Sequence, residues 1–507
     1  MNNLSEKRKK ELARLRGEVA QKTIEIIKLI AERNRLAERI GSVKRSEGLP
    51  LDDEKVEDEL LRKVLREGEK RGVERQLVAK IVSSLISEAK RTQGQNPGEG
   101  RASPMSVLTK VVKLQREGKK VIRLDVGEPD FPPPAAVVEA CQEALKGQKT
   151  HYTESRGIPE LVEALRAYLK SKSHFDAKPG ELVVTVGGRF AVYAAIATAV
   201  KEGESAMIIE PAWPAYKEQI EFVGGKAISL QTRLEDGWEA SAEMIEERIG
   251  PNTKAIVLNY PSNPTGKIVK PSLFREILEV ANDHNLTVIS DEVYDSYSFA
   301  PCPSILEGGA ERFILTSSFS KTWSMTGFRV GYAVCDGRQT AEKIAMLASL
   351  MYTSVPEFIQ YGAIKALESE EEATRNREQM RERIAIASRE LDRIPGLKYY
   401  RPDGAMYVFP ELREESFDSS GFADSLLNEN AVSVIPGTGF KRSLEGRCAR
   451  LFGRDGFPPR EVLHIEGAPS SRLRPEQEGE AHSRAQIRAL ESKRRRGSEA
   501  RASRASD

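Results

Sequence analysis

The stretch LTSSFSKTWSMTGFRVGY, residues 315–332, places one lysine where an interior strand is expected to end. The apolar run RFILTSSFS leads to Lys321, and Arg329 follows eight residues later among small and hydroxyl-bearing residues. A lysine held out of water has a lowered pKa and can form an imine with an aldehyde. The residue types around Lys321 therefore indicate covalent chemistry at a strand end.

Other polar residues also follow apolar runs. Asp291 and Tyr294 lie in VISDEVY, and Asn263 lies in LNYPSNPTG. In VTVGGRFAVY, a glycine pair leads into the start of a helix, whose free backbone amides suit a phosphate. Each has a structural alternative: Asp291 could cap a helix, the glycines could form a turn, and Arg329 could make a surface ion pair. Together with Lys321 they predict one cofactor site, because a buried carboxylate can keep a pyridine nitrogen protonated.

The elements that must position these residues alternate from 104 to 440. Apolar runs such as ELVVTVG, SAMIIE, KAIVLNYP, LTVISDEVY and RFILTSSFS are separated by amphipathic helical segments. This alternation predicts an α/β fold with a mainly parallel sheet covered by helices on both faces. Ligands of such folds bind at the carboxyl ends of the strands, which is where the polar residues occur.

These motifs resemble those of the class I and II aminotransferases, which belong to the fold-type I pyridoxal-phosphate family. The resemblance runs from VGEPDF (126–131) to PGTGF (436–440), and SxSKxxxxxGxR combined with NPTG and SDEVY is a highly specific pattern. It implies a mainly parallel central sheet, a smaller α+β domain and pyridoxal 5'-phosphate (PLP) as cofactor. It makes Lys321 the imine-forming lysine and proton shuttle, and it pairs Asp291 with the pyridine nitrogen.

The same resemblance assigns the remaining cofactor contacts. Asn263 and Tyr294 are expected at the ring hydroxyl, and Trp213 in EPAWPAY is expected to stack on the ring. Tyr152 in HYTESRG is expected to reach the phosphate of a neighbouring subunit, which implies a homodimer. The phosphate side is expected to be lined by Gly188, Arg189, Ser318, Ser320 and Arg329.

Three residues are candidates for contact with the aminotransferase substrate. Gly127 in VGEPDF is expected to contact it, and Arg189 falls where relatives that take dicarboxylic substrates carry a basic residue. Arg189 could bind the distal carboxylate of aspartate, glutamate or prephenate, or it could be a solvated cation at a helix start. The family places an arginine for the substrate's α-carboxylate on a strand after PGTGF, and EGRCARLFG offers Arg450 there.

The first ninety residues carry a second set of cations. No proline or glycine interrupts 18–40, so 12–44 is predicted to be one long helix. Positions that repeat at alternating intervals of four and three residues are mostly apolar, as a buried seam requires, but they include Arg16, Arg33 and Lys44. One long cation could extend out of a bundle, whereas three on one seam indicate an acidic small-molecule ligand.

Spacing along that helix has a further consequence. Arg16 and Lys44 are about 42 Å apart at 1.5 Å per residue, which is farther than a metabolite reaches. If both serve one pocket, a second copy of the helix running the other way must supply Arg16. The first segment therefore predicts a homodimer as well.

This segment resembles the all-helical chorismate mutase family, and the three cations fall at that family's intervals without a gap. By the resemblance Arg16 and Arg33 hold the carboxylates of chorismate, and Lys44 and Gln93 donate to its ether oxygen. Such a rearrangement needs no cofactor, only a compact substrate conformer and stabilised charge on that oxygen.

Two further residues are expected at the mutase site, and two other positions differ from the family. Glu57 is expected to bind the ring hydroxyl, and Asp53 is a further polar substrate contact. Val56 replaces an arginine and Ala89 replaces a serine found in well-known members, and neither position is expected to be essential to the chemistry.

Composition divides the chain into four parts. They are a basic mutase domain (1–93), a linker (94–103), an acidic aminotransferase domain (104–440) and a basic, divergent tail (441–507) that is expected to be disordered. The tail has no closing amphipathic helix, and one hypothesis is a reading-frame shift, which resequencing the gene would test. The four cysteines have no metal-ligand or disulfide spacing. Without a membrane-spanning run or a signal peptide, the expected compartment is the cytoplasm.

The sequence therefore predicts a bifunctional enzyme of aromatic amino-acid biosynthesis. It would rearrange chorismate to prephenate and transfer an amino group from an amino donor to prephenate, phenylpyruvate or 4-hydroxyphenylpyruvate. One alternative is an aspartate aminotransferase with a regulatory or dimerising mutase-like domain. Another is a DNA-binding regulator, which the long first helix disfavours. We expect small-molecule substrates and no nucleic-acid, membrane or metal partner.

Overall fold

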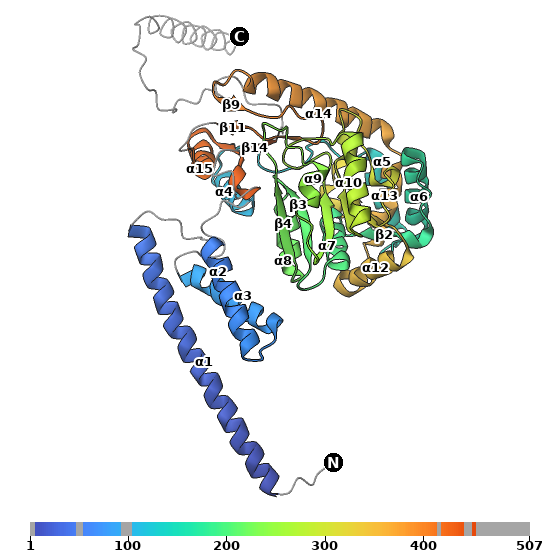
Figure 1. Ribbon diagram of the computed structural model, residues 1–507. Coiled ribbons are helices and arrows are strands. Elements are labelled where there is room, and N and C mark those ends of the chain that lie inside the picture. The colour runs from blue at the N-terminus through green and yellow to red at the C-terminus, as the bar shows by residue number, and fades with distance from the viewer. Residues whose placement is uncertain (1–5, 47–53, 93–103, 413–416, 441–448, 453–507) are drawn as a thin grey trace, which may run out of the picture. The chain divides into compact units, whose positions relative to one another are not determined.

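The computed structural model of the chain describes residues 6–46, 54–92, 104–412, 417–440 and 449–452. Its N-terminal part is helical, with α1 (Glu6–Ser46), α2 (Glu54–Lys70) and α3 (Arg75–Thr92). Figure 1 shows α1 as one continuous helix, which confirms the long helix predicted over 12–44. Helices α2 and α3 lie close together at Gly68, where a Cβ atom would come within 2.6 Å of a Val78 methyl group.

Only part of α1 is covered by α3. Ala37 and Gly41 on α1 are buried, as are Val78 and Val82 on α3. Nearer its N-terminus α1 leaves apolar side chains in water, and Val19 is 66% exposed. Exposed apolar surface of this kind is unfavourable in water, so this half of α1 presents a face suited to a partner helix.

A seven-stranded sheet forms the centre of the following domain, in the order β2-β8-β7-β6-β5-β3-β4. Every apolar run singled out in the sequence contains one of its strands: β2 (Leu182–Thr185), β3 (Ser205–Glu210), β5 (Thr253–Leu258), β6 (Thr287–Asp291) and β7 (Phe313–Ser318). The sheet also contains β4 (Lys226–Gln231) and β8 (Gly331–Cys335). Only β8 runs antiparallel to its neighbours, so the predicted mainly parallel sheet is confirmed.

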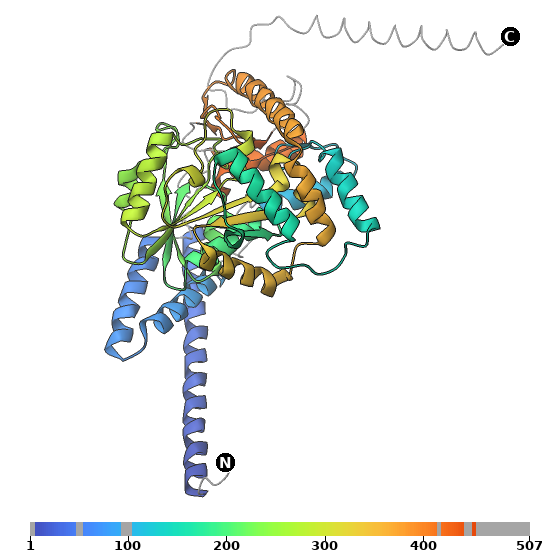
Figure 2. The ribbon, with the colours of Figure 1, turned by 90° about the vertical axis from the view of Figure 1, so that its right-hand side faces the viewer.

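Alternate residues of these strands point to opposite faces of the sheet. In β5, Ile256 packs with α5 (Ala135–Lys146), α6 (Pro159–Ser173), α10 (Pro271–Asp283) and α13 (Glu357–Leu367). Val257 packs on the other face with α7 (Gly188–Ala199), α8 (Ala215–Phe222) and α12 (Arg338–Tyr352). Figure 2 shows the sheet between the two helical layers. Burial on both faces explains why the strands are almost entirely apolar.

A smaller α+β domain packs around its own core, which includes Val111, Trp238, Phe409 and Phe440. Its helices are α4 (Pro104–Arg116), α14 (Glu370–Leu391) and α15 (Ser419–Asn430). Its short strands pair as β1 (Ile122–Arg123) with β12 (Val432–Ser433), and β9 (Leu397–Lys398) with β11 (Glu411–Leu412). A third sheet has the order β10 (Tyr407–Val408), β14 (Ala449–Phe452), β13 (Ile435–Pro436).

Strand β14 lies beyond residue 440, where the sequence analysis placed the end of this domain. It pairs with β10 and β13, so the strand expected in EGRCARLFG is present. The other boundaries, at 93 and 103, fall outside the described residues and stay predictions. A short helix, α9 (Ala242–Glu246), comes between β4 and β5 in the sequence. In the described ranges, no helix combines the length and apolar character needed to cross a membrane.

Candidate active sites

The strand ends of the large sheet meet at one edge. Strand β2 is antiparallel to β8, which is antiparallel to β7, so β2 points the same way as the parallel strands. The residues predicted for cofactor binding follow the carboxyl ends of these strands: Gly188 after β2, Trp213 after β3, Asn263 after β5, Asp291 at the end of β6 and Lys321 after β7. One edge therefore gathers side chains that are far apart in sequence.

A cavity of about 360 Å³ opens at this edge. Among the predicted site residues, those that line it are Gly127, Gly188, Arg189, Trp213, Asn263, Asp291, Tyr294, Ser318, Ser320, Lys321 and Arg329. The structure thus brings together the predicted cofactor residues of one chain, apart from Tyr152. A volume of this size is in the range of small-molecule sites.

Lys321 reaches the cavity from α11 (Phe319–Thr322), the short helix that follows β7. Ser318 caps this helix, and its hydroxyl accepts a hydrogen bond from the Ser320 amide at 3.2 Å. The Lys321 ammonium donates to the carbonyl of Gly127. Strand β7 ends at Ser318, three residues before the lysine. Lys321 itself is only partly buried, and its amine opens into the cavity.

Asp291 is a carboxylate of the buried strand β6 and is 5% exposed. The Tyr216 hydroxyl donates to its Oδ2 at 2.6 Å, and the Val293 amide donates to its Oδ1 at 3.4 Å. Burial raises the pKa of Asp291 to about 6, although these two hydrogen bonds and the charge of Lys321 lower it. A cation placed against this carboxylate would offset the burial penalty, as a protonated pyridine nitrogen would do.

Three polar groups lie in a row at another wall of the cavity. The Asn263 amide nitrogen lies 3.4 Å from the Tyr294 hydroxyl, and that hydroxyl lies 2.6 Å from the Tyr407 hydroxyl. The backbone N–H of Asn263 donates to the side-chain oxygen of Asn259 at 2.8 Å, which fixes the loop after β5. This arrangement suits a ligand oxygen that accepts hydrogen bonds.

The third wall is cationic. Arg329 and Arg189 both line it, and burial together with the positive charge of Arg189 lowers the pKa of Arg329. Helix α7 begins beside them without a side-chain cap. Gly187 has φ +83°, and a Cβ there would lie 2.6 Å from an Arg329 nitrogen, so only glycine fits. Two like charges next to free helix amides are stabilised by an anion between them.

These walls fit PLP. The cationic wall suits its phosphate, the buried Asp291 suits its pyridine nitrogen, and Lys321 lines the same cavity. Trp213 adds a ring on which the cofactor can stack, and it packs edge-on against Tyr216 with ring centroids 5.3 Å apart. The guanidinium carbon of Arg189 lies 4.8 Å from the centroid of the Trp213 ring. Arg189 therefore lines the cavity and contacts the expected cofactor-stacking residue.

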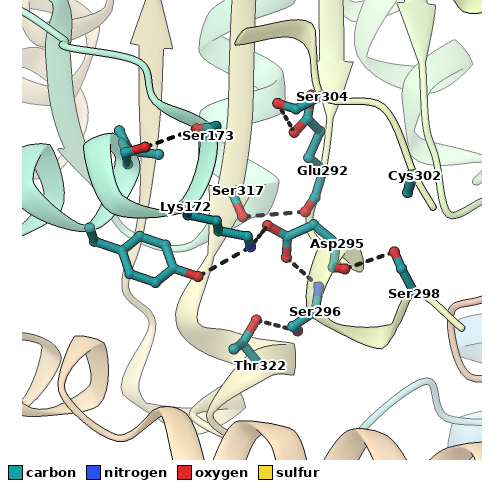
Figure 3. Close-up of polar contacts among 12 residues, drawn as sticks. Lys172, Ser173, Glu292, Asp295, Ser296, Ser298, Cys302, Ser304, Ser317 and Thr322 are labelled. Carbon is teal, nitrogen blue, oxygen red and sulfur yellow. Dashed lines mark hydrogen bonds and ion pairs between the residues drawn. The ribbon is translucent and has the colours of Figure 1, made fainter. Parts of the chain in front are cut away.

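A second polar network lies around Glu292, the residue after Asp291 (Figure 3). Glu292 follows Asp291 and points away from it, as alternation along a strand requires. Its carboxylate accepts hydrogen bonds from the Ser304 hydroxyl and the Ile305 amide, both at 2.8 Å, and from the Ser290 hydroxyl at 2.9 Å. Burial raises the pKa of Glu292 to about 7 despite these bonds.

The same network continues to the helix that carries the lysine (Figure 3). The Lys172 ammonium lies 2.5 Å from the Asp295 carboxylate, which also accepts from the Ser296 amide at 2.6 Å. The Ser296 hydroxyl then bonds to the Thr322 hydroxyl at 2.7 Å. Because Thr322 is next to Lys321, this network ties the loop after β6 to the lysine-bearing helix.

Tyr152 lies outside the cavity of its own chain and is 87% exposed. Its loop is nevertheless fixed: Gln360, which is fully buried, donates to the Thr153 hydroxyl at 3.0 Å and accepts from the Ile158 amide at 2.8 Å. A rigid loop that presents an exposed tyrosine agrees with the expectation that Tyr152 serves a neighbouring subunit.

The predicted mutase cations all lie on α1. Arg33 is half-buried and donates to the Leu85 carbonyl of α3 at 2.7 Å. Lys44 is half-buried near the end of α1, whereas Arg16 is exposed in the other half of the helix. Since α1 is continuous, Arg16 and Lys44 stay about 42 Å apart along it, and one chain cannot bring them together.

Only some of the other residues predicted for the mutase site lie in the described part of the structure. Glu57 lies on α2, but its side chain is outside the described part of the structure, and so are Asp53 and Gln93. Val56 is exposed on α2 and Ala89 is buried on α3. Arg450 lies on β14, opposite Ile435 of β13, and its side chain is likewise not described.

Sequence reasoning missed two tyrosines of the cavity. Tyr216 lies on the first turn of α8, three residues after Trp213, and this closeness in sequence was the available signal. Tyr407 lies on a two-residue strand of the smaller domain, more than a hundred residues after Tyr294. Only the packing of the two domains brings these hydroxyls together, and no local pattern in the sequence indicates it.

Both parts of the chain match known protein families. Residues 119–451 match the family model "Aminotransferase class I and II", and residues 15–94 match "Chorismate mutase type II". A "Probable aspartate/prephenate aminotransferase" of Aquifex aeolicus is 34% identical over 66% of this chain and 88% of that protein. The "Aspartate/prephenate aminotransferase" of Thermus thermophilus is 32% identical over 69% of this chain and 91% of its own length.

Solved structures agree with these matches. The crystal structure of aspartate aminotransferase from Thermus thermophilus with maleate superposes with a TM-score of 0.65. It is 31% identical in sequence, and the superposition covers 72% of this chain and 94% of that one. The family to which it belongs is PLP-dependent. The chain therefore belongs to the class I and II aminotransferases and carries a type II chorismate mutase domain in front of the aminotransferase domain.

Proposed function

We propose that this bifunctional enzyme rearranges chorismate to prephenate and then aminates a keto acid of the same pathway. The observation that carries the proposal is the presence of both families in one chain. Prephenate, the product of the first reaction, is itself a keto acid that the second site could take. The two relatives named above as aspartate/prephenate aminotransferases support this pairing.

In the mutase, catalysis requires holding a dicarboxylate in its compact conformer. Arg33 is suited to this because its guanidinium is anchored on the Leu85 carbonyl and keeps further donors for a carboxylate. Lys44 is half-buried, so its charge is poorly screened and can stabilise the ether oxygen as charge develops there. Gln93, Glu57 and Asp53 are proposed to complete this site.

A second copy of α1 is proposed to supply Arg16. The seam residues Val19 and Ile26 are exposed in the single chain, at 66% and 56%, and a paired helix would cover them. Mixing the variants Arg16→Ala and Lys44→Ala tests this directly. Each alone has no intact site, whereas a mixed dimer keeps one site with both native cations, so mixing restores mutase activity. No recovery after verified subunit exchange contradicts the shared site.

In the aminotransferase, PLP would supply the electron sink for amino transfer. Lys321 is placed to link to the cofactor and to move a proton at the substrate's α-carbon. Asp291, held ionised by Tyr216, would keep the pyridine nitrogen protonated. Arg329, Arg189 and the start of α7 would hold the phosphate, and Tyr152 of the second subunit would reach it.

The substrate side chain is proposed to meet Arg189. This arginine lines the cavity and packs on Trp213, so a flat or dicarboxylic keto acid would find both a cation and an aromatic surface. Arg450 on β14 is the proposed partner of the α-carboxylate. The proposed compartment remains the cytoplasm.

Steady-state rates with prephenate, phenylpyruvate, 4-hydroxyphenylpyruvate and oxaloacetate test the substrate assignment. We expect an aromatic-pathway keto acid to give the highest kcat/KM. If oxaloacetate is the only acceptor, the alternative holds: an aspartate aminotransferase, as the Thermus neighbour's name indicates, with a regulatory mutase-like domain. Residues 15–94 match a chorismate mutase model, and this match argues against a DNA-binding domain in the first segment.

A further inference from the structure

We infer that Lys172 of α6 is a positioning residue for Lys321, which it fixes through a chain of polar contacts that ends on α11. The chain consists of Lys172, Asp295, Ser296 and Thr322 (Figure 3). Lys172 does not line the cavity, so it acts through these residues and not by touching the cofactor. The inference rests on the proposed PLP site and adds to it a residue from outside the cavity.

The chain starts with an ion pair between two elements. The Lys172 Nζ atom lies 2.5 Å from Asp295 Oδ2 and 3.2 Å from the hydroxyl of Tyr168, one turn earlier on α6. The Lys172 and Asp295 side chains are 38% and 24% exposed, so the pair is partly shielded from water. Burial lowers the pKa of Lys172, but the charge of Asp295 and the contact with Tyr168 outweigh it and raise this pKa well above its usual value. Lys172 is therefore a cation at neutral pH and a fixed partner for Asp295.

Asp295 passes this restraint to the next residue. It begins the single turn of 3₁₀ helix, Asp295–Tyr297, that follows β6. While its Oδ2 faces Lys172, its Oδ1 accepts a hydrogen bond from the Ser296 backbone amide at 2.6 Å. The Asp295 carbonyl accepts from the Ser298 hydroxyl at 2.8 Å, which closes the turn. Because a carboxylate is planar and accepts through both oxygens, the lysine on one oxygen sets the direction of the other oxygen and so the position of Ser296.

Ser296 meets the lysine-bearing helix at the last residue of that helix. Its hydroxyl oxygen lies 2.7 Å from that of Thr322, and the contact holds whichever hydroxyl donates. Helix α11 has only four residues, and a helix of one turn is not stable by itself. Ser318 caps its start and Ser296 holds its end, so contacts at both ends set how α11 lies. Lys321 and Thr322 are neighbours about 100° apart around the helix axis, so a rotation at Thr322 moves the Lys321 amine in the cavity.

Loss of the Lys172 charge should loosen the Lys321 amine without changing the walls of the cavity. PLP becomes linked when the neutral amine attacks its aldehyde carbon and loss of water leaves a C=N bond. An amine that samples more positions forms this bond more slowly, and we expect a rate about three- to tenfold lower. Binding of the phosphate and the ring should not change, because the residues proposed for them do not take part in the chain. Pyridoxamine 5'-phosphate separates the two effects, since it carries an amine in place of the aldehyde and cannot form the bond.

The test compares full-length wild type with Lys172→Met, which keeps the aliphatic stem and removes the charge. Lys170→Met is the matched control, because Lys170 lies on the same helix and has its own carboxylate partner, Asp176, at 3.3 Å. Lys172→Arg restores a cation, and Ser296→Ala breaks the chain while it leaves the ion pair in place.

Two quantities are measured for each protein. The first is the rate constant of the visible absorbance change when PLP is added to the apo-protein. The second is the dissociation constant of pyridoxamine 5'-phosphate. Borohydride reduction followed by peptide mapping identifies Lys321 as the residue that is linked to PLP.

We expect Lys172→Met and Ser296→Ala to slow link formation about three- to tenfold and to leave the affinity for pyridoxamine 5'-phosphate unchanged. Lys172→Arg and Lys170→Met should both stay close to wild type. In the Ser296→Ala background, Lys172→Met should add nothing. The inference is overturned if either Lys172→Met or Ser296→Ala links PLP at the wild-type rate, if Lys172→Met weakens pyridoxamine 5'-phosphate binding by the same factor, or if its effect persists in the Ser296→Ala background. A wild type that forms no link at Lys321 overturns the proposed function itself, and the inference with it.

Discussion

Replacing Tyr216 with phenylalanine should shift the protonation of Asp291 and, through it, the pH dependence of cofactor binding. The Tyr216 hydroxyl donates to the Asp291 carboxylate at 2.6 Å inside the protein. A hydrogen bond to a charged group contributes about 1.5–3 kcal/mol, and one pKa unit corresponds to about 1.4 kcal/mol. Loss of the hydroxyl should therefore raise the pKa of Asp291 by about one to two units.

The starting value makes this shift visible near neutral pH. Burial raises the pKa of Asp291 to about 6 in the wild type, so roughly 90% of the carboxyl is ionised at pH 7. In Tyr216→Phe the ionised fraction at pH 7 should fall to roughly 10–50%. If PLP needs the ionised carboxylate, its affinity at pH 7 should drop about two- to tenfold, with the loss growing at lower pH and vanishing well above pH 8.

The assay is the dissociation constant of PLP from the apo-protein between pH 5.5 and pH 9. Titration of PLP itself and of Lys321 is common to both proteins, so the difference between their curves isolates Asp291. Tyr193→Phe is the matched control, because Tyr193 packs on Phe222 and does not line the cavity. Curves for wild type and Tyr216→Phe that differ by the same factor at every pH would refute the reasoning.

Other variants test the two sites and their support separately. Arg33→Ala should reduce mutase kcat/KM by at least tenfold, whereas Arg35→Ala, an exposed arginine of the same helix, should not; equal losses would contradict the site. Lys321→Ala should abolish amino transfer and leave mutase rates unchanged, and any retained amino transfer would count against its role. Glu292 has a pKa of about 7, raised by burial, so wild-type stability should fall as pH rises from 4.5 to 7, by on the order of 3 kcal/mol. Glu292→Gln should remove that dependence in urea unfolding at pH 5 and pH 8; an unchanged pH dependence would show that another group causes it.

Much of the aminotransferase could be predicted from sequence because its residues follow strands. The parallel strands are buried on both faces, so they appear as apolar runs, and their carboxyl ends must meet at one edge. Asp291 and Lys321 were therefore predicted to share a site although 30 residues separate them. The lysine at the end of an interior strand belongs to a short capped helix that leaves the sheet.

Contacts that depend on packing between distant segments could not be predicted. Tyr407 reaches Tyr294 from another domain, and the Ser296 to Thr322 hydrogen bond joins two loops. In the mutase, Arg16 and Lys44 could be placed on one helix from spacing alone, but the helix cannot bring them together. A pocket shared by these two cations would require a second chain, and the sequence indicates this only through their distance; exposed apolar residues such as Val19 agree with it.

The central claim is that one chain converts chorismate into an aminated product of the aromatic pathway. The most direct test supplies purified full-length protein and PLP with chorismate and with either nitrogen-labelled glutamate or, in a separate reaction, nitrogen-labelled aspartate, and follows the label by mass spectrometry. The account predicts label in aminated prephenate or in phenylalanine, loss of that product in Arg33→Ala, and its recovery when prephenate is added to the variant. Chorismate loss no faster than in buffer, or label that passes from glutamate only to aspartate when oxaloacetate is supplied, would contradict it.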